Sequence, residues 1–239
     1  MLELILPAGV ECEERFGEPS GGVLFPEEQQ LIAHAVPARR REYATVRGCA
    51  RACLGRLGYP QLPILPGVGG APTWPAGVHG SMTHCPGYAA AAVGPDRQIL
   101  AIGIDAEPDA PLPDQVLELV ATPAEQHRLA TIEPPPDSPN LGSPNWGSPN
   151  WGSPNWGSPN WDRLLFSAKE ALYKAWYPQV GEWLDHHEAE IHFHPHQASF
   201  TAHLSRDGLI INNRHIHHLH GRWTRERGIL VTAVTVAST

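Results

Sequence analysis

Residues 162–178, DRLLFSAKEALYKAWYP, carry the pattern that most restricts the fold of this 239-residue chain. Apolar side chains recur there at helical spacing, which predicts an amphipathic helix that must bury one face. The apolar positions are Leu164, Leu165, Ala168, Ala171, Leu172 and Ala175. We expect Asp162 to cap the helix at its start and Pro178 to end it.

Strand-like segments follow this helix to the end of the chain. They cover 191–204, 208–225 and 228–238, and they are separated by turn residues. Their β-branched content and alternation predict an antiparallel sheet. The C-terminal half therefore reads as one long helix followed by a sheet.

The N-terminal half repeats this order. Helical spacing predicts helices at 26–36 and 38–58, and a loop rich in Pro and Gly follows at 60–79. Strands are predicted at about 87–93 and at 99–108. The five residues between them, GPDRQ, are a natural hairpin connection.

Together, the two halves predict an α+β fold of two similar lobes with a pseudo-twofold relation, each a helix packed on an antiparallel sheet. We place the N-terminal lobe at 1–108 and the C-terminal lobe at 109–239. A helix is predicted at 114–130, and its second part has a capped start near Thr122. Residues 138–161 repeat the unit SPNWG, whose Pro and Gly forbid a regular helix or central strand, so we expect a surface loop there.

Composition narrows the functional classes. The net charge of −8 does not favour bulk nucleic-acid binding, and no apolar run is long enough to span a membrane. The first residues have no basic leader, which predicts a cytoplasmic protein. The four cysteines fit a reducing compartment and complete no zinc pattern.

Two acidic residues stand where the strand at 99–108 ends. Asp105 and Glu107 are two apart, so both side chains lie on one face of the strand. Two carboxylates on one face repel each other unless a cation or a proton intervenes. This pair is therefore half of a site for a hard metal ion, although an isolated D-x-E is more often a solvated strand edge.

The helix at 162–178 brings a second charged group. Glu170 and Lys174 are four apart and share one face, which alone would be an ordinary surface pair. The chain has fifteen Arg but only two Lys, Lys169 and Lys174, and both lie in this helix. A Lys amine can be tuned to lose its proton, whereas an Arg guanidinium cannot.

These segments resemble the signature motifs of the 4′-phosphopantetheinyl transferases, of the larger two-lobed Sfp/EntD-like type. GIDAEP and FSAKEALYK carry the two main motifs, GVHGSMTH resembles a third, and RRREYATVRGCARACLGRLG resembles an Arg-bearing helix of the family. Val46 stands where a Gly is more usual before Arg47. The motifs occur in family order over residues 39–178, which makes the joint match specific.

The resemblance implies an enzyme of the holo-[acyl-carrier-protein] synthase type. It would transfer phosphopantetheine from coenzyme A to a serine of an apo acyl or peptidyl carrier protein and release 3′,5′-ADP. The carriers of polyketide, nonribosomal-peptide and fatty-acid biosynthesis are all open as partners. The resemblance also implies a monomer that acts on neither nucleic acid nor membrane.

The resemblance also assigns residues. The catalytic set is Asp105, Glu107, Glu170 and Lys174, and the Mg²⁺ ligands, with Mn²⁺ as an alternative ion, are Asp105, Glu107 and Glu170. The expected coenzyme A contacts are Arg47, Arg51, Ser81, Thr83, His84, Lys169 and Lys174. Which of Arg39, Arg40 and Arg41 adds to them is open. The base that accepts the serine proton is also open among Glu125, Glu133 and Asp137, and we favour Glu125 as a first-turn acid of its own helix.

Two other functions remain as alternatives. The C-terminal half is rich in histidine, and alternate residues of a strand share a face. His192, His194 and His196, or His215 and His217, are therefore candidate ligands for Zn²⁺ or Ni²⁺ in a metal-binding module. A catalytically inactive relative that only binds carrier proteins is the other alternative, and the retained charged motifs argue against it.

Overall fold

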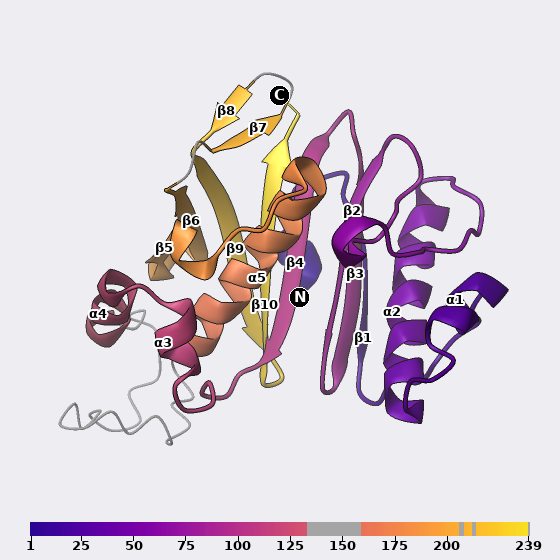
Figure 1. Cartoon of the computed structure of the whole chain (residues 1–239), viewed down its shortest axis with the longest axis horizontal. Helices are drawn as coiled ribbons and strands as arrows, with labels where there is room; N and C mark the ends of the chain where they lie inside the picture. Colours follow the sequence, from indigo (N-terminus) through magenta and orange to yellow (C-terminus); the bar gives the residue numbers. More distant parts are fainter. Residues whose placement is uncertain (133–158, 206–207, 212–213, 239) are drawn as a thin grey trace.

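A computed structural model describes residues 1–132, 159–205, 208–211 and 214–238 of the chain. Figure 1 shows two lobes side by side, each a sheet with one long helix against it. The described elements before residue 109 are β1 (Glu11–Phe16), α1 (Pro26–Leu31), α2 (Pro37–Arg56), β2 (Val78–Cys85), β3 (Tyr88–Pro95) and β4 (Ile99–Pro108). Those after it are α3 (Val116–Val120), α4 (Pro123–Thr131), α5 (Trp161–Val180), β5 (Ala189–His194), β6 (Ser199–Leu204), β7 (Leu209–Ile211), β8 (Arg214–Ile216), β9 (His218–Glu226) and β10 (Ile229–Ala237).

The N-terminal lobe is an antiparallel sheet of order β1-β3-β2 with helix α2 packed on it. Strand β3 reads YAAAAVGP and is buried along its whole length. Its small alanine side chains let α2 approach closely, and Cys49, Cys53 and Leu54 of the helix pack there against Ala91 and Val93. Two of the four cysteines are thus small core residues, and all four are free thiols.

The C-terminal lobe is an antiparallel sheet of order β4-β10-β9-β6-β5, and the twenty-residue helix α5 lies across one face of it. Leu164, Leu165, Leu172 and Trp176 of α5 belong to the largest apolar cluster of the protein. The amphipathic pattern at 162–178 therefore buries the predicted face, and the prediction of an α+β fold with two lobes is confirmed.

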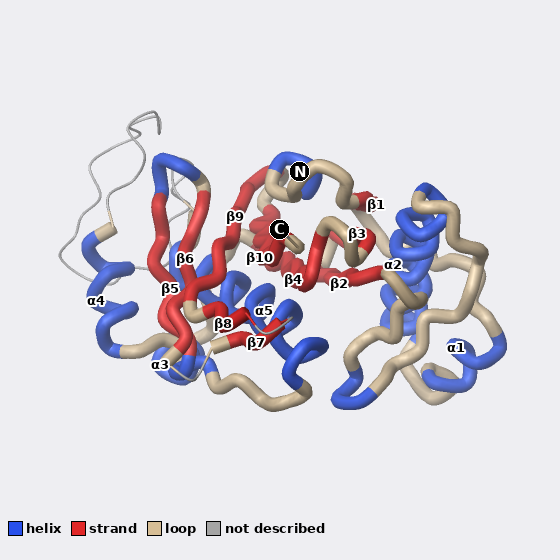
Figure 2. Tube along the Cα trace, turned by 90° about the horizontal axis from the view of Figure 1, so that it is seen from above, coloured by secondary structure: helices blue, strands red, loops and turns tan. Residues whose placement is uncertain are grey.

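Side-chain hydroxyl groups join the two sheets. Strand β4 hydrogen-bonds along its length with β10 of the C-terminal sheet, while its other edge lies beside β2 (Figure 2). There Ser81 Oγ accepts from the backbone N–H of Ile104, and Thr83 Oγ1 accepts from that of Ala106, both at 3.0 Å. Two buried hydroxyls thus replace the backbone ladder that would otherwise extend one sheet into the other.

Gly103 allows α5 to lie directly on β4. A Cβ atom at this position would stand 1.9 Å from the carbonyl oxygen of Ala171 and 2.5 Å from the backbone nitrogen of Ala175. Both atoms are helix backbone, which cannot move aside as a side chain can. The close approach fixes the height of α5 above the strand that carries Asp105 and Glu107.

The predicted pairing of the strand at 99–108 needs correction. The strand at 99–108 has the predicted bounds, but its partner is β10, whereas β3 pairs with β1 and β2, so GPDRQ does not join a hairpin. A boundary at 108 would also group this strand with the N-terminal elements, although its ladder belongs to the C-terminal sheet. Period-two patterning marks a strand but does not identify its partner.

The ends of α5 also differ from the prediction. The helix begins after Asn160, and Asp162 lies in its first turn, where Oδ2 accepts from the backbone N–H of Leu112 at 2.8 Å. Pro178 stands inside the last turn, and the helix ends at Gly181, whose φ of 74° is the left-handed conformation that glycine favours. Strands β1 and β2 were missed, because the former is acidic and the latter follows the loop at 60–79.

Three further features of the sequence concern a helix cap, the apolar content of the helices and the SPNWG repeat. Thr122 and Glu125 form the expected capping box at the start of α4. No helix in the described part of the chain is both long and apolar enough to cross a membrane. Most of the SPNWG repeat lies in 133–158, outside the described residues.

Replacing Gly103 with Ala should unfold the protein at a markedly lower temperature. The added Cβ would collide with the backbone of α5, and overpacking of this kind costs about 3 kcal/mol or more when backbone must move. For a chain of this size, that cost corresponds to a fall in Tm of at least about 6 °C. Thermal unfolding followed by circular dichroism measures it.

Gly48→Ala is the matched control. Gly48 lies inside α2, and a Cβ there would meet nothing within 4 Å. This substitution should raise stability slightly, by about 1 kcal/mol, because Ala favours a helix interior over Gly. Equal effects of the two substitutions would contradict the role given to Gly103.

Candidate active site

A cavity of about 550 Å³ lies between the two lobes. Helix α2, strand β2 and the loop at 66–72 line it from the N-terminal lobe, and helix α5 closes it from the C-terminal lobe. Its charged and polar lining residues are Arg39, Tyr43, Arg47, Ser81, Thr83, His84, Glu170, Tyr173, Lys174 and Tyr177. Three of the four predicted motif regions therefore line the pocket. The fourth, strand β4, supplies Asp105, which accepts a hydrogen bond from the pocket residue Lys174.

Asp105 is the most buried carboxylate of this region, with 5% of its surface exposed. Its Oδ1 accepts from Lys174 Nζ at 2.7 Å and from Thr83 Oγ1 at 3.3 Å. Its Oδ2 is buried and has no hydrogen-bond partner among the residues that the structure describes. A buried carboxylate oxygen without a partner is costly, so this atom calls for a cation or a donor from outside the chain.

Glu107 and Glu170 are coupled to Asp105 by charge. Burial raises the pKa of both side chains, and the negative charge of Asp105 raises each pKa further. Arg163 holds Glu107 through Nη1 at 2.9 Å from Oε2. Three carboxylates from β4 and α5 thus share one region, and Lys174 and Arg163 balance only part of their charge.

The helical period places Lys174 as predicted. It follows Glu170 by one turn on the face of α5 that looks toward β4, and both residues line the pocket. Because Gly103 lets α5 lie close to β4, the Lys174 amine contacts Asp105 on that strand. The sequence-based grouping of Asp105 with Lys174 therefore corresponds to a direct contact.

One of the three arginines at the start of α2 points into the pocket. Arg39 Nη1 contacts Nε2 of His84, and both side chains line the cavity. Arg40 instead donates to the carbonyl oxygens of Ala33 and Ala35, in the segment that precedes α2. Burial, and after it the charge of Arg39, lower the pKa of His84, so its ring is a neutral acceptor toward Arg39.

Arg47 lines the same pocket and stands over an aromatic ring. Its Cζ lies 3.2 Å from the centroid of the Tyr43 ring, and its Nε donates to the carbonyl oxygen of Ile64 at 3.0 Å. Burial lowers the pKa of Arg47 to about 10. A largely buried guanidinium that still faces a cavity is suited to bind an anion.

Arg51 lies elsewhere, although the motif match predicts a ligand contact. Its Nη1 donates to both carboxylate oxygens of Glu28, at 2.8 and 3.1 Å, and its Nη2 donates to the carbonyl oxygen of Val23. Glu28 is fully buried, and Arg51 is not among the residues that line the pocket. This arginine ties α1 to α2.

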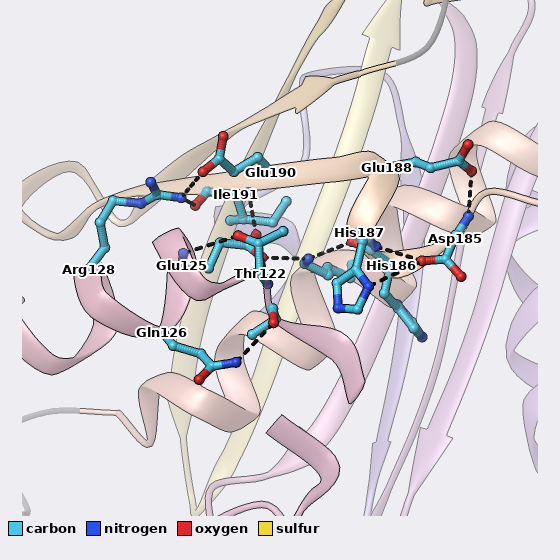
Figure 3. Close-up of polar contacts among 12 residues, drawn as sticks. Thr122, Glu125, Gln126, Arg128, Asp185, His186, His187, Glu188, Glu190 and Ile191 are labelled. Carbon is cyan, nitrogen blue, oxygen red and sulfur yellow. Dashed lines mark hydrogen bonds and ion pairs between the residues drawn. The ribbon is translucent and has the colours of Figure 1, made fainter. Parts of the chain in front are cut away.

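Lys169 is also directed away from the pocket. Its amine is buried and donates to Glu125 Oε2 at 2.8 Å and to the carbonyl oxygen of His186 at 2.6 Å. Figure 3 shows that Glu125 also serves Thr122 and Ile191, whose backbone N–H groups donate to it at 2.8 and 2.7 Å. Glu125 is thus saturated by structural contacts, while Glu133 and Asp137 lie outside the described residues.

Ser81 and Thr83 line the pocket, but their hydroxyls are used at the junction with β4 described above. The sequence left open which of Arg39, Arg40 and Arg41 turns inward, and Tyr43 was not predicted as a site residue. Arg39 and Tyr43 follow from the spacing of α2, because they and Arg47 are four apart and share one face.

Histidines do not form a three-ligand metal centre in the described residues, where no three His, Cys, Asp or Glu side chains are placed to hold a metal ion as they stand. The rings of His192 and His203 instead lie against each other at a tilt of 51°, with 4.7 Å between their centroids. The absence of a ready-made three-ligand group also applies to Asp105, Glu107 and Glu170. As the structure stands, Asp105 contacts Lys174 and Glu107 contacts Arg163. The cluster His192, His194 and His196 predicted for a metal module is therefore not formed.

Comparisons with known proteins agree with the motif match. Residues 27–94 match the family described as the 4′-phosphopantetheinyl transferase N-terminal domain, and residues 101–232 match the 4′-phosphopantetheinyl transferase superfamily. The chain is 44% identical over 241 residues to the 4′-phosphopantetheinyl transferase Svp of Streptomyces mobaraensis, covering 100% of this chain and 90% of that protein.

Two further relatives extend this comparison. The 4′-phosphopantetheinyl transferase PptT of Mycobacterium tuberculosis is 39% identical over 240 residues, which cover 97% of this chain and 96% of the relative. Enterobactin synthase component D of Escherichia coli strain K12 is 34% identical over 99 residues, 41% of this chain and 47% of that protein.

Lys169→Met should destabilise the protein because it leaves Glu125 charged and buried. Removing one partner of a buried ion pair costs about 3–5 kcal/mol, or a fall in Tm of at least about 6 °C. The double variant Lys169→Met/Glu125→Gln should be more stable than Lys169→Met alone, since no lone charge remains. Thermal unfolding of the single and double variants measures this coupling.

Arg128→Met serves as the control for that cycle. Arg128 binds Glu190 at 2.7 Å (Figure 3). The pair is partly exposed, because 35% of the Arg128 side chain and 36% of the Glu190 side chain are accessible to solvent. Loss of such a pair costs about 1 kcal/mol or less. Strictly additive effects of the Lys169 and Glu125 substitutions would show that the pair has no structural role.

Proposed function

The chain belongs to the 4′-phosphopantetheinyl transferase superfamily, and we propose that its inter-lobe pocket binds coenzyme A beside a Mg²⁺ ion held by Asp105, Glu107 and Glu170. As an enzyme of this superfamily, it transfers the phosphopantetheine group from coenzyme A to carrier proteins. The residue roles below belong to the proposal.

One observation carries the metal assignment: the buried Oδ2 of Asp105 has no partner among the described residues. The two nearby glutamates also carry raised pKa values that a bound cation would lower. Carboxylate oxygens are the ligands that Mg²⁺ prefers, and Mn²⁺ accepts the same donors. The chemistry of the donor set therefore fits a hard divalent cation.

A Mg²⁺ ion bound there would neutralise the diphosphate of coenzyme A and stabilise the departing 3′,5′-ADP. Lys174 would also offset the negative charge of the diphosphate, because its amine lines the pocket and is hydrogen-bonded to Asp105. In the reaction the serine oxygen of the carrier forms a bond to the pantetheine-bearing phosphorus, and the bond from that phosphorus to the ADP oxygen breaks. The serine proton passes to a base, for which Glu125 is unsuited because its oxygens are already engaged.

The remaining phosphate charge of coenzyme A would meet the cationic side of the pocket. Arg39 and Arg47 line the cavity and would donate to phosphate oxygens. His84 also lines it, and because its Nε2 accepts from Arg39, only Nδ1 of the neutral ring would donate. Arg51 and Lys169 have no part in this arrangement, since their donors are bound to Glu28 and Glu125. Ser81 and Thr83 act by placing β4 against β2.

The proposal extends to the surroundings of the enzyme. The acceptors are acyl or peptidyl carrier proteins of fatty-acid, polyketide or nonribosomal-peptide biosynthesis. We take the protein to be a cytoplasmic monomer that acts on neither nucleic acid nor membrane. The histidine-rich strands have no separate metal-storage function in this proposal.

Asp105→Asn should lower the transfer rate by about 100-fold or more, because the amide keeps the shape but loses the charge that holds the cation. The measurement is the mass increase of an apo carrier protein incubated with Mg²⁺, coenzyme A and enzyme. Thermal unfolding checks that the variant is folded.

Asp114→Asn is the control, since it makes the same chemical change at an exposed position outside the pocket. It should leave the rate unchanged. An Asp105→Asn variant as active as the wild type would refute the metal assignment, and no modification by the wild type of any carrier tested would refute the proposed function.

Mg²⁺ should bind more tightly as pH rises from about 5 to about 8. The raised pKa values of Glu107 and Glu170 mean that protons stay on these groups above the usual carboxylate range, and each proton competes with the metal. Calorimetric titration with Mg²⁺ at several pH values measures the effect, and chelation with EDTA should abolish transfer until Mg²⁺ is restored.

Glu170→Gln tests the origin of this pH dependence. It removes one of the two groups, so the Mg²⁺ affinity should fall and vary less with pH. It should also raise the Tm of the metal-free protein at pH 8 but not at pH 4, since a raised carboxyl pKa destabilises the fold only above the unfolded-state value. An affinity for Mg²⁺ that is flat over this range would contradict the assignment.

A further inference from the structure

Tyr43 lines the pocket and carries a buried polar atom that has no partner among the described residues. Its ring lines the cavity between Arg39 and Arg47, one helical turn from each along α2. The buried atom is its hydroxyl oxygen. Burial raises the pKa of this hydroxyl, so it keeps its proton and can act as a donor.

The ring of Tyr43 already has a structural use, whereas the described residues give its hydroxyl no partner. The guanidinium of Arg47 lies over the ring, 3.2 Å from Cζ to the centroid, and a phenylalanine would offer the same surface. A buried hydroxyl without a partner destabilises the protein. This donor belongs to a side chain that lines a cavity together with two arginines, which indicates an acceptor that arrives with an anionic ligand.

Helix spacing and direct contacts order the groups along the pocket. Tyr43 and Arg47 follow Arg39 by one and two turns of α2. On its other side, Arg39 Nη1 contacts Nε2 of His84. His84 follows Thr83, which donates to Asp105 Oδ1, the oxygen that also accepts from Lys174. Arg39 therefore stands between two regions, with Tyr43 and Arg47 in one and His84, Lys174 and Asp105 in the other.

Coenzyme A has two separate phosphate groups, a diphosphate and a ribose 3′-phosphate. The proposed function places the diphosphate beside Asp105 and Lys174, where the bond breaks. The region of Tyr43 and Arg47 is then left for the other phosphate, whose oxygens are strong acceptors.

We propose that the Tyr43 hydroxyl donates a hydrogen bond to the ribose 3′-phosphate of coenzyme A and so helps the enzyme select coenzyme A over its 3′-dephosphorylated form. The inference rests on the proposed function, because it requires coenzyme A in this pocket. Tyr43 touches a part of the substrate remote from the reacting phosphorus. Its hydroxyl should therefore affect binding and leave the chemical step unchanged.

The test compares wild type and Tyr43→Phe with coenzyme A and with 3′-dephospho-coenzyme A. We expect the KM and the calorimetric Kd for coenzyme A to rise about 10-fold, which is the loss of one hydrogen bond to a charged group. The kcat should stay within about twofold, and the Kd for the dephosphorylated form should not change. The Tm without ligand should rise, because the buried unpaired hydroxyl is gone.

Tyr59→Phe is the matched control. Tyr59 lies outside the pocket lining, and its hydroxyl donates to the carbonyl oxygen of Ala76 at 3.2 Å. This variant should bind both nucleotides as the wild type does and should show no rise in Tm.

Several outcomes would overturn the inference. One is an unchanged Kd for coenzyme A in Tyr43→Phe, and another is an equal rise in Kd for coenzyme A and its dephosphorylated form. A third is a Tyr43→Phe variant that does not fold or unfolds at a lower temperature, because that result would mean that the hydroxyl has a structural partner. A wild-type protein that binds no coenzyme A would refute the proposed function and this inference with it. Wild-type binding with an unaltered Tyr43→Phe variant would refute this inference alone.

Discussion

The close contact between helix α5 and strand β4 at Gly103 is the constraint on which the rest of the structure depends. A side chain at that point would overlap the backbone of Ala171, so only glycine lets the helix reach the strand. The contact carries Glu170 and Lys174 down to the level of Asp105. It also closes the pocket from the C-terminal side, because the same helix face continues to Tyr177.

Strand β4 is the second half of this arrangement, because it belongs to one sheet and borders the other. Its backbone is shared between the ladder with β10 and the hydroxyls of Ser81 and Thr83 on β2. The strand therefore holds both lobes at one spacing, and the pocket forms along that junction. Ser81 and Thr83, which the motif match marks as ligand contacts, support the site by positioning the strand.

The charges of the site are arranged by burial. Asp105, Glu107 and Glu170 are partly balanced by Lys174 and Arg163, and one oxygen of Asp105 has no partner within the described part of the chain. The two buried pairs outside the pocket, Arg51 with Glu28 and Lys169 with Glu125, hold helices in place. Arg51 and Lys169 therefore stabilise the fold, whereas Arg39, Arg47 and Lys174 line the pocket and are the cations to which the proposed function assigns ligand binding.

The sequence by itself determined the α+β class, the long helix at the centre of the C-terminal lobe, and the pairing of residues that share a face, because periods of two and of 3.6 follow from local backbone geometry. Asp105 with Glu107 and Glu170 with Lys174 were found in this way. The tertiary structure alone decided which sheet β4 joins, which of the adjacent arginines turns inward, and that Arg51 and Lys169 meet buried acids. Those choices depend on contacts between residues far apart in the chain, such as Lys169 with Glu125 or Arg51 with Glu28, and a one-dimensional pattern does not contain them.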